Sequence, residues 1–126
     1  MTLLYVALGG AVGATLRFLS VQWMTRAFGP AFPVGTLAVN VAGSLVMGIV
    51  AAYFITRGDG APTPLALFTM TGVLGGFTTF SAFSLDALLL IEQGRAVVAA
   101  AYIGLSVVLS IGALFIGITL TRSVLS

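Results

Sequence analysis

The chain has 126 residues, of which 60% are hydrophobic and only 6% are charged, and its mean hydropathy is +1.20. A water-soluble domain of this size does not form with so few charges, so the composition indicates a membrane protein. Each membrane span needs roughly 20 apolar residues, which leaves room for about four spans and for no catalytic domain outside the membrane. The absence of cysteine and histidine excludes disulfides, thiol chemistry and the usual transition-metal sites. The net charge of +2 comes from isolated arginines rather than from a basic patch that would bind nucleic acid.

We predict the first membrane span at about residues 3–25. Residues 2–16 are apolar and no basic segment precedes them, so we interpret them as part of a retained span rather than a signal peptide. Gly9 and Gly13 have the GxxxG spacing that lets two helices approach closely in lipid. Arg17 lies within the apolar run, and two interpretations stay open. Its side chain either extends to the membrane surface or forms the cationic mouth of an anion path.

The second span is predicted at about residues 34–55, after the turn-rich connection Arg26–Pro33. Its one strongly polar side chain is Asn40, which shares a helix face with Thr36 and Ser44, four residues before and after it. An asparagine in a span often joins two helices through hydrogen bonds. Alternatively, its amide donates hydrogen bonds to a passing anion. One residue can do both at different moments.

The third span, predicted at about residues 65–91, has an unusual centre. The sequence from Gly72 to Asp86 is GVLGGFTTFSAFSLD, in which paired glycines and β-branched threonines weaken a helix. We therefore expect the helix to break there, and a break at membrane depth persists only where protein or a water-filled cavity satisfies the freed backbone groups. Because transporters hold ions at such breaks, we predict that this segment handles an ion.

The fourth span is predicted at about residues 97–120. Tyr102, Ser106 and Ser110 follow one another at intervals of four residues and therefore share one face of this helix. The serine hydroxyls either bond back to carbonyls of their own helix or form a hydroxyl track that faces the break in the third span. We expect residues 1–126 to form a single transmembrane domain.

The arginines give little information about orientation in the membrane. Four spans place both termini on one side, together with Arg57 and Arg122, whereas Arg26 and Arg95 lie on the other side, with Arg17 if it extends that way. Such a balance is expected for copies that insert both ways round. Four short helices do not easily enclose a path alone. We therefore expect an antiparallel homodimer of eight helices whose two-fold axis lies in the membrane plane.

The polar groups inside the spans argue against an enzyme and favour an anion path. No serine has a general base beside it, and the two carboxylates near the end of the third span do not converge. The amide of Asn40 and the hydroxyls can donate hydrogen bonds, and Phe80 and Phe83 can turn their positive ring edges toward an anion. Packing against lipid or the core is the other role open to these rings. Freed carbonyls around Gly75–Thr78 suit a small hard cation such as Na⁺.

Three segments resemble the Fluc (CrcB) family of fluoride channels: GGAVGATLR at Gly9–Arg17, GTLAVNVAGSLVMG at Gly35–Gly48 and GVLGGFTTFSAFS at Gly72–Ser84. The resemblance implies an all-α membrane protein with four transmembrane helices per subunit, the third helix broken at its centre. It also implies an antiparallel dual-topology homodimer with two pores, each built from both subunits. Such a protein is not an enzyme but a passive, highly selective fluoride channel of the plasma membrane (the inner membrane in a Gram-negative cell). It exports cytoplasmic fluoride and protects against fluoride toxicity, with fluoride, the lipid bilayer and a second copy as partners, and without nucleic acid or ATP.

The resemblance further implies roles for individual residues. Two phenyl rings facing fluoride by their edges, an amide bonding the ion, the hydroxyls of a polar track and an arginine near an aqueous vestibule would form the fluoride pathway: Phe80, Phe83, Asn40, Thr79, Ser81, Ser84, Ser110 and Arg17. The backbone carbonyls of Gly75 and Thr78 would bind a structural Na⁺ at the dimer axis. Two positions depart from the usual pattern of the family, because Ala82 replaces a threonine and Asp86 replaces a glutamate.

The main alternative is a small multidrug-type exporter, which also has four spans and dual topology. It would require a membrane-embedded glutamate in the first span, and residues 2–16 contain no carboxylate. A helical membrane subunit with packing roles alone is a further hypothesis. It gives no reason for the concentration of hydroxyls, rings and glycines in the centre of one span.

Overall fold

The computed structural model describes residues 1–58 and 63–126. Four helical segments of this described part are long and apolar enough to cross a membrane: Thr2–Phe28, Val34–Arg57, Pro64–Glu92 and Ala96–Leu125. The shortest has 24 residues and is about 36 Å long at 1.5 Å per residue, which exceeds the ~30 Å of the hydrocarbon core. All regular secondary structure in the described ranges is helical. The prediction of an all-α protein with four membrane-spanning helices is therefore confirmed.

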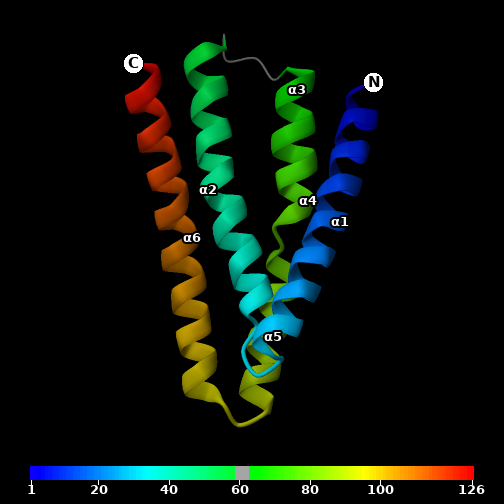
Figure 1. The fold of residues 1–126 in the computed structure, drawn as a ribbon, viewed down its shortest axis with the longest axis vertical. Coiled ribbons are helices and arrows are strands. Elements are labelled where there is room, and N and C mark those ends of the chain that lie inside the picture. Colours follow the sequence, from blue (N-terminus) through cyan, green and yellow to red (C-terminus); the bar gives the residue numbers. More distant parts are fainter. Residues whose placement is uncertain (59–62) are drawn as a thin grey trace.

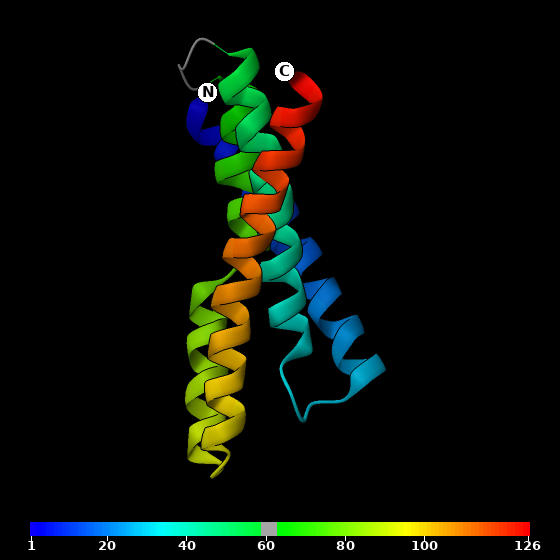
Figure 2. The ribbon, with the colours of Figure 1, turned by 90° about the vertical axis from the view of Figure 1, so that its left-hand side faces the viewer.

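The four segments run alternately up and down, so both termini lie at the same end of the molecule (Figure 1). Consequently α2 (Val34–Arg57) and α6 (Ala96–Leu125) run in the same direction, and they pack along much of their length (Figure 2). Glycines make this packing close. A Cβ atom at Gly48 would lie 3.1 Å from the backbone nitrogen of Ile118, and one at Gly117 would lie 3.1 Å from that of Ile49.

Glycines also bring α1 (Thr2–Phe28) against the third span. A Cβ atom added at Gly9 would lie 2.9 Å from the Cα of Gly72, and one added at Gly76 would lie 2.8 Å from the carbonyl oxygen of Gly10. Gly13 is equally confined, because a Cβ atom there would lie 2.9 Å from the backbone nitrogen of Phe77. The GxxxG spacing in the first span therefore does provide the close helix–helix contact that the sequence predicted.

The third span consists of several helical pieces in line. It begins with α3 (Pro64–Ala66), where the Thr63 hydroxyl accepts a hydrogen bond from the backbone nitrogen of Ala66 at 3.1 Å. The π-helical segment η1 (Leu67–Leu74), a single turn α4 (Gly75–Phe77) and the helix α5 (Phe80–Glu92) follow. Between the last two, Thr78 and Thr79 have extended backbones with ψ of 157° and 122°. The span as a whole bends only slightly.

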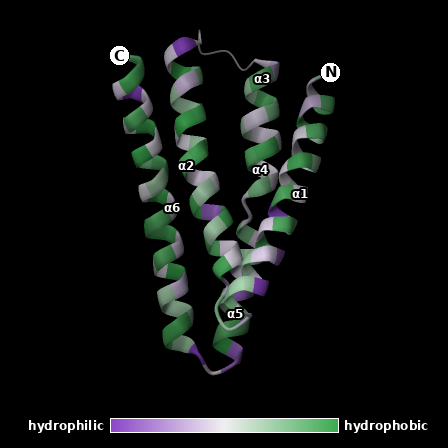
Figure 3. Cartoon of the chain, in the orientation of Figure 1, coloured by the Kyte–Doolittle hydropathy of each residue, from purple (hydrophilic) through white to green (hydrophobic). Residues whose placement is uncertain are grey.

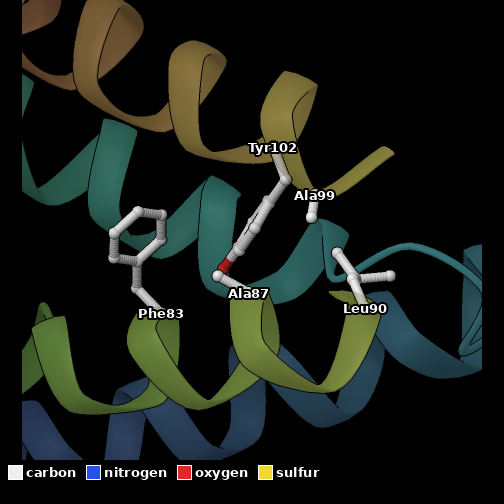
Figure 4. Close-up of a cluster of buried hydrophobic side chains, with 5 residues drawn as sticks. All are labelled: Phe83, Ala87, Leu90, Ala99 and Tyr102. Atoms are coloured by element: carbon white, nitrogen blue, oxygen red, sulfur yellow. The ribbon is translucent and has the colours of Figure 1, made fainter. Parts of the chain in front are cut away.

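The main buried cluster lies between α5 and α6, toward the end opposite the termini. It is formed by side chains from both helices (Figure 4): Phe83, Ala87, Leu90, Ala99 and Tyr102. Tyr102 is completely buried and points from α6 toward α5. Outside this cluster, hydrophobic residues cover the helices along their length, and hydrophilic residues lie mainly near the helix ends (Figure 3). Such an apolar exterior is what a lipid environment requires.

Candidate functional site

The interruption in the third span is joined to α2 by the side-chain amide of Asn40. Its Nδ2 atom donates a hydrogen bond to the carbonyl oxygen of Thr79 at 3.0 Å, and its Oδ1 atom accepts one from the backbone nitrogen of Thr79 at 2.8 Å. Asn40 thus joins two helices, as one of its two sequence interpretations proposed. Because an amide NH₂ carries two hydrogens, one N–H remains beyond the bond to Thr79. The two interpretations of Asn40 are therefore compatible.

At this junction, the backbone nitrogens that would bond to the carbonyls of Gly75 and Thr78 bond to side chains instead. In a continuous α-helix, the nitrogens of Thr79 and Ala82 would bond to the carbonyls of Gly75 and Thr78, four residues earlier. Instead, the Thr79 nitrogen donates to Asn40, and the Ala82 nitrogen donates to the Thr79 hydroxyl at 3.2 Å. The carbonyls of Gly75 and Thr78 are the two that the family resemblance implies as Na⁺ ligands.

A cavity of about 330 Å³ lies beside this junction, between α2, the third span and α6. Its walls include five of the predicted pathway residues: Asn40, Thr79, Phe80, Phe83 and Ser110. Ser44 of α2 and Ser106 of α6, which are not among the pathway residues that the resemblance implies, also line it. The remaining lining is largely apolar, and no carboxylate belongs to it. The cavity therefore presents hydrogen-bond donors and phenyl rings without a fixed negative charge.

The hydroxyls of Ser106 and Ser110 are buried, and neither has a hydrogen-bond partner within the described part of the chain. The interpretation that these serines bond back to their own helix is therefore wrong for both. A buried hydroxyl without a partner is costly in an apolar environment. These two hydroxyls therefore indicate that a hydrogen-bonding ligand can bind in the cavity beside them. The intervals of four residues along α6 already predicted this shared face, and Ser106 belongs with Ser110 on it.

Phe80 and Phe83 lie at the cavity with their ring centroids 5.5 Å apart and their planes inclined by 52°. Phe83 is 9% exposed and belongs to the buried cluster, whereas Phe80 is 78% exposed. The two rings therefore differ in what holds them. Phe83 is fixed by contacts inside this chain, and Phe80 projects from it.

A second cavity, of about 500 Å³, lies on the other side of Thr79 between α1, α2 and α5. Arg17, Ser81 and Ala82 line it together with Thr79. The half-buried Arg17 and Ala82, the alanine that replaces the usual threonine of the family, thus line the same cavity. Ser84 lines neither of the two cavities. Its hydroxyl donates to the Phe80 carbonyl at 2.9 Å within α5.

Tyr102 and Asp86 form a polar pair that the sequence analysis did not predict. The Tyr102 hydroxyl donates a hydrogen bond to Oδ2 of Asp86 at 3.1 Å. The ring of Tyr102 lies 5.2 Å from that of Phe83, centroid to centroid. A fully buried tyrosine needs a partner for its hydroxyl, which is the signal that could have paired it with the nearest carboxylate in a neighbouring span.

No group of three or more histidine, cysteine, aspartate or glutamate residues that could hold a metal ion occurs among the described residues. The oxygens that the family resemblance implies for a Na⁺ ion are the carbonyls of Gly75 and Thr78 described above. Neutral carbonyl oxygens fit a hard monovalent cation, and Gly75 is exposed on the surface of the chain.

Comparison with known proteins gives consistent matches over nearly the whole chain. Residues 4–118 match the family model described as "CrcB-like protein, Camphor Resistance (CrcB)". A protein of Cereibacter sphaeroides named "Fluoride-specific ion channel FluC" is 54% identical over 121 residues, covering 96% of this chain and 94% of that protein. Proteins of the same name from Rhizobium etli and a Ruegeria species are each 53% identical, over 120 and 127 residues. They cover 95% and 100% of this chain, and 95% and 98% of those proteins.

Proposed function

The chain belongs to the CrcB-like protein family, and from this membership we propose that it is a passive, highly selective fluoride channel rather than an enzyme. It is a multi-pass protein of the bacterial plasma membrane, with four apolar helices long enough to cross the bilayer. The observation that carries the proposal is the cavity beside the Asn40–Thr79 junction. This cavity lies at the middle of the spans. Its lining combines hydrogen-bond donors with two phenyl rings and contains no carboxylate.

The lining of this cavity suits a small anion. The amide of Asn40 and the hydroxyls of Ser106 and Ser110 can donate hydrogen bonds that replace the hydration shell of the ion. Phe80 and Phe83 contribute ring edges, which carry the positive part of the aromatic quadrupole. Arg17 lines the neighbouring chamber and attracts anions to its mouth. In this scheme Thr79, which lines both cavities, lies between the vestibule and the pore.

Passive conduction is enough to protect a bacterial cell. Hydrogen fluoride crosses membranes as a neutral acid and dissociates in the more alkaline cytoplasm, where the anion is trapped. The inside-negative membrane potential then drives fluoride outward through any open anion path, at about 2.3 kcal/mol per charge for each 100 mV. Neither ATP nor a coupled ion is required.

The interruption at Thr78 and Thr79 serves in this proposal as a functional helix break that holds a structural Na⁺. The carbonyls of Gly75 and Thr78 would bind the ion, because their usual helical donors bond to Asn40 and to the Thr79 hydroxyl. A bound cation supplies a fixed positive charge at the centre of the protein. In this proposal one chain provides two oxygens, and the site is complete when a second copy contributes the same pair.

An antiparallel, dual-topology homodimer would supply that second copy. Gly75 and the strongly exposed ring of Phe80 lie on the surface of the single chain, where a partner would cover them and close the pore. The arginines support both orientations, since Arg57 and Arg122 lie near the end that holds the termini and Arg26 and Arg95 near the other. Each dimer would then contain two pores.

Fluoride efflux from liposomes tests the function. Liposomes loaded with fluoride and containing the purified protein should release it rapidly when a potassium ionophore balances the charge, as read by a fluoride electrode. Chloride-loaded liposomes should release almost nothing. A small multidrug-type exporter would instead move organic cations in exchange for protons without releasing fluoride, and that result would overturn the proposal.

Dual topology has a separate test, because the chain contains no cysteine. In a Ser126→Cys variant, a membrane-impermeant thiol reagent added to intact cells should label about half of the copies, and the rest only after permeabilisation. Labelling from a single side of the membrane would contradict an antiparallel dimer.

A further inference from the structure

We propose that Phe32 and Arg95 are positioning residues of the pore. In this inference Arg95 fixes the connection between α1 and α2 against the start of α6, and Phe32, held in that connection, fixes the ring of Tyr102 beside Phe83. The inference rests on the proposed function as a fluoride channel. It concerns residues 29–33, which line neither of the two cavities described above.

The connection is tied to α6 by one charged hydrogen bond. Arg95, which lies at the N-terminal cap of α6, donates from its guanidinium to the carbonyl oxygen of Ala31. Hydrogen bonds from a charged donor are stronger than those between neutral groups. The connection itself is short and stiff, because Pro30 and Pro33 restrict its backbone and the Val34 nitrogen bonds to the Phe32 carbonyl at 2.7 Å.

Phe32 contacts Tyr102 through a specific ring geometry. The two ring centroids are 5.5 Å apart and the planes are inclined by 88°, an edge-to-face arrangement. On its other side Tyr102 meets Phe83 at 5.2 Å, and its hydroxyl bonds to Asp86. The ring of Tyr102 is therefore held by two rings and one hydrogen bond, and it has no exposed surface.

A chain of contacts thus runs from the end of the molecule to the pore. Arg95 forms a hydrogen bond to the connection, which includes Phe32. The ring of Phe32 packs against that of Tyr102, and the ring of Tyr102 packs against that of Phe83. Phe83 lines the cavity, where a tilt of its ring would change the edge presented to the anion. Loss of Phe32 or Arg95 removes one support of Tyr102 without touching the cavity wall.

The first test measures fluoride efflux from liposomes for Phe32→Leu and Arg95→Gln. We expect each to lower the rate about two- to tenfold, the range that one edge-to-face aromatic contact contributes, while the dimer remains intact by size-exclusion chromatography. The conservative variants Phe32→Tyr and Arg95→Lys should restore most of the rate, because they keep a ring and a charged donor at these positions.

Two matched controls accompany these variants. Arg26→Gln removes the same charge from the same end of the molecule, and Phe28→Leu makes the same replacement at an exposed phenylalanine of α1. Both should conduct normally. If Arg95→Gln conducts normally too, or if its loss of flux is matched by Arg26→Gln or accompanied by loss of the dimer, the positioning role is overturned.

The second test follows Tyr102 directly and does not depend on transport. The protein labelled with 3-fluorotyrosine should give three ¹⁹F resonances, one for each tyrosine, and Tyr102→Phe identifies the relevant one. Phe32→Leu and Arg95→Gln should shift this resonance, whereas Arg26→Gln should not. An unshifted resonance overturns the inference even if the channel function stands. Absence of fluoride efflux from the unaltered protein overturns the proposed function instead, whatever the resonances show.

Discussion

Asn40 and Thr79 form a two-way hydrogen-bonded pair across 39 residues of sequence: the Asn40 amide donates to the Thr79 carbonyl at 3.0 Å and accepts from the Thr79 nitrogen at 2.8 Å. The Oδ1 atom of Asn40 takes the place of the Gly75 carbonyl, to which the Thr79 nitrogen would bond in a continuous helix. The amide N–H adds a second bond, to the Thr79 carbonyl. This is how a backbone without helical hydrogen bonds is accommodated at the centre of a span.

Asn40→Asp should abolish fluoride efflux. A carboxylate at this position places a fixed negative charge beside an anion path, and one of its oxygens would face the Thr79 carbonyl instead of donating to it. Liposome efflux measures the effect. Asn40→Leu separates charge from pairing, because it loses both hydrogen bonds without adding charge and should lower the unfolding free energy by about 2 kcal/mol or more. Undiminished conduction by Asn40→Asp would place this residue outside the path.

Phe80→Ile and Phe83→Ile should both cut fluoride flux sharply while the dimer persists, but they should differ in stability. Phe83 is packed in the buried cluster, so its replacement leaves a cavity and should cost about 1–3 kcal/mol. Phe80 is 78% exposed in the single chain, so its replacement should leave the fold of that chain nearly as stable. Thermal unfolding in detergent, measured beside efflux, checks both parts. Normal flux in both variants would remove the rings from the mechanism.

Ser106→Ala and Ser110→Ala should slow conduction without lowering stability. Neither hydroxyl has a partner in the described part of the chain, so its removal loses no internal hydrogen bond and relieves a buried polar group worth ~1 kcal/mol or more. Efflux and thermal unfolding are again the measurements. Ser84→Ala provides the contrast, because the Ser84 hydroxyl already bonds to the Phe80 carbonyl. A larger loss of flux in Ser84→Ala than in the other two variants would contradict the role given to the α6 serines.

Gly75→Val should weaken the dimer more than it alters selectivity. A Cβ atom at Gly75 would meet only the Met70 carbonyl at 3.6 Å within the chain, so the fold has room for the side chain whereas a second copy at this face would not. The oligomer and the fluoride-to-chloride flux ratio would be measured together. Gly104, which has open space around it, gives the matched Gly104→Val control. A stable Gly75→Val dimer would argue against the proposed cation site between two copies.

The Gly13→Val change should act differently, because it disrupts the fold of the single chain. A side chain at Gly13 would press into the backbone of the third span near Phe77, and overpacking of this kind typically costs about 1–3 kcal/mol. We expect poor yield and a lowered melting temperature. Normal stability of this variant would contradict the close α1 contact.

The sequence predicted the spans well because long apolar runs and glycine spacing are local properties. The four helices, the close contact at Gly9 and Gly13, and the unusual centre of the third span were all readable from local composition. The hydrogen bond between Tyr102 and Asp86 was not, since it depends on how α5 and α6 are rotated against each other. Likewise, helix spacing does not determine the side-chain rotamer of each α6 serine, and the rotamer decides whether its hydroxyl bonds to its own helix.

The sequence by itself thus determined that this is a four-span membrane protein whose polar groups inside the spans suit an anion rather than a catalytic reaction. Only the tertiary structure decided which of those groups meet. It placed Asn40, Thr79, Phe83 and Ser110 around one cavity and Arg17 with Ser81 around another. The Ser84 hydroxyl instead bonds to a carbonyl of its own helix. The physical reason is that spacing along a helix defines a face, whereas the packing of helices through close glycine contacts determines what that face touches.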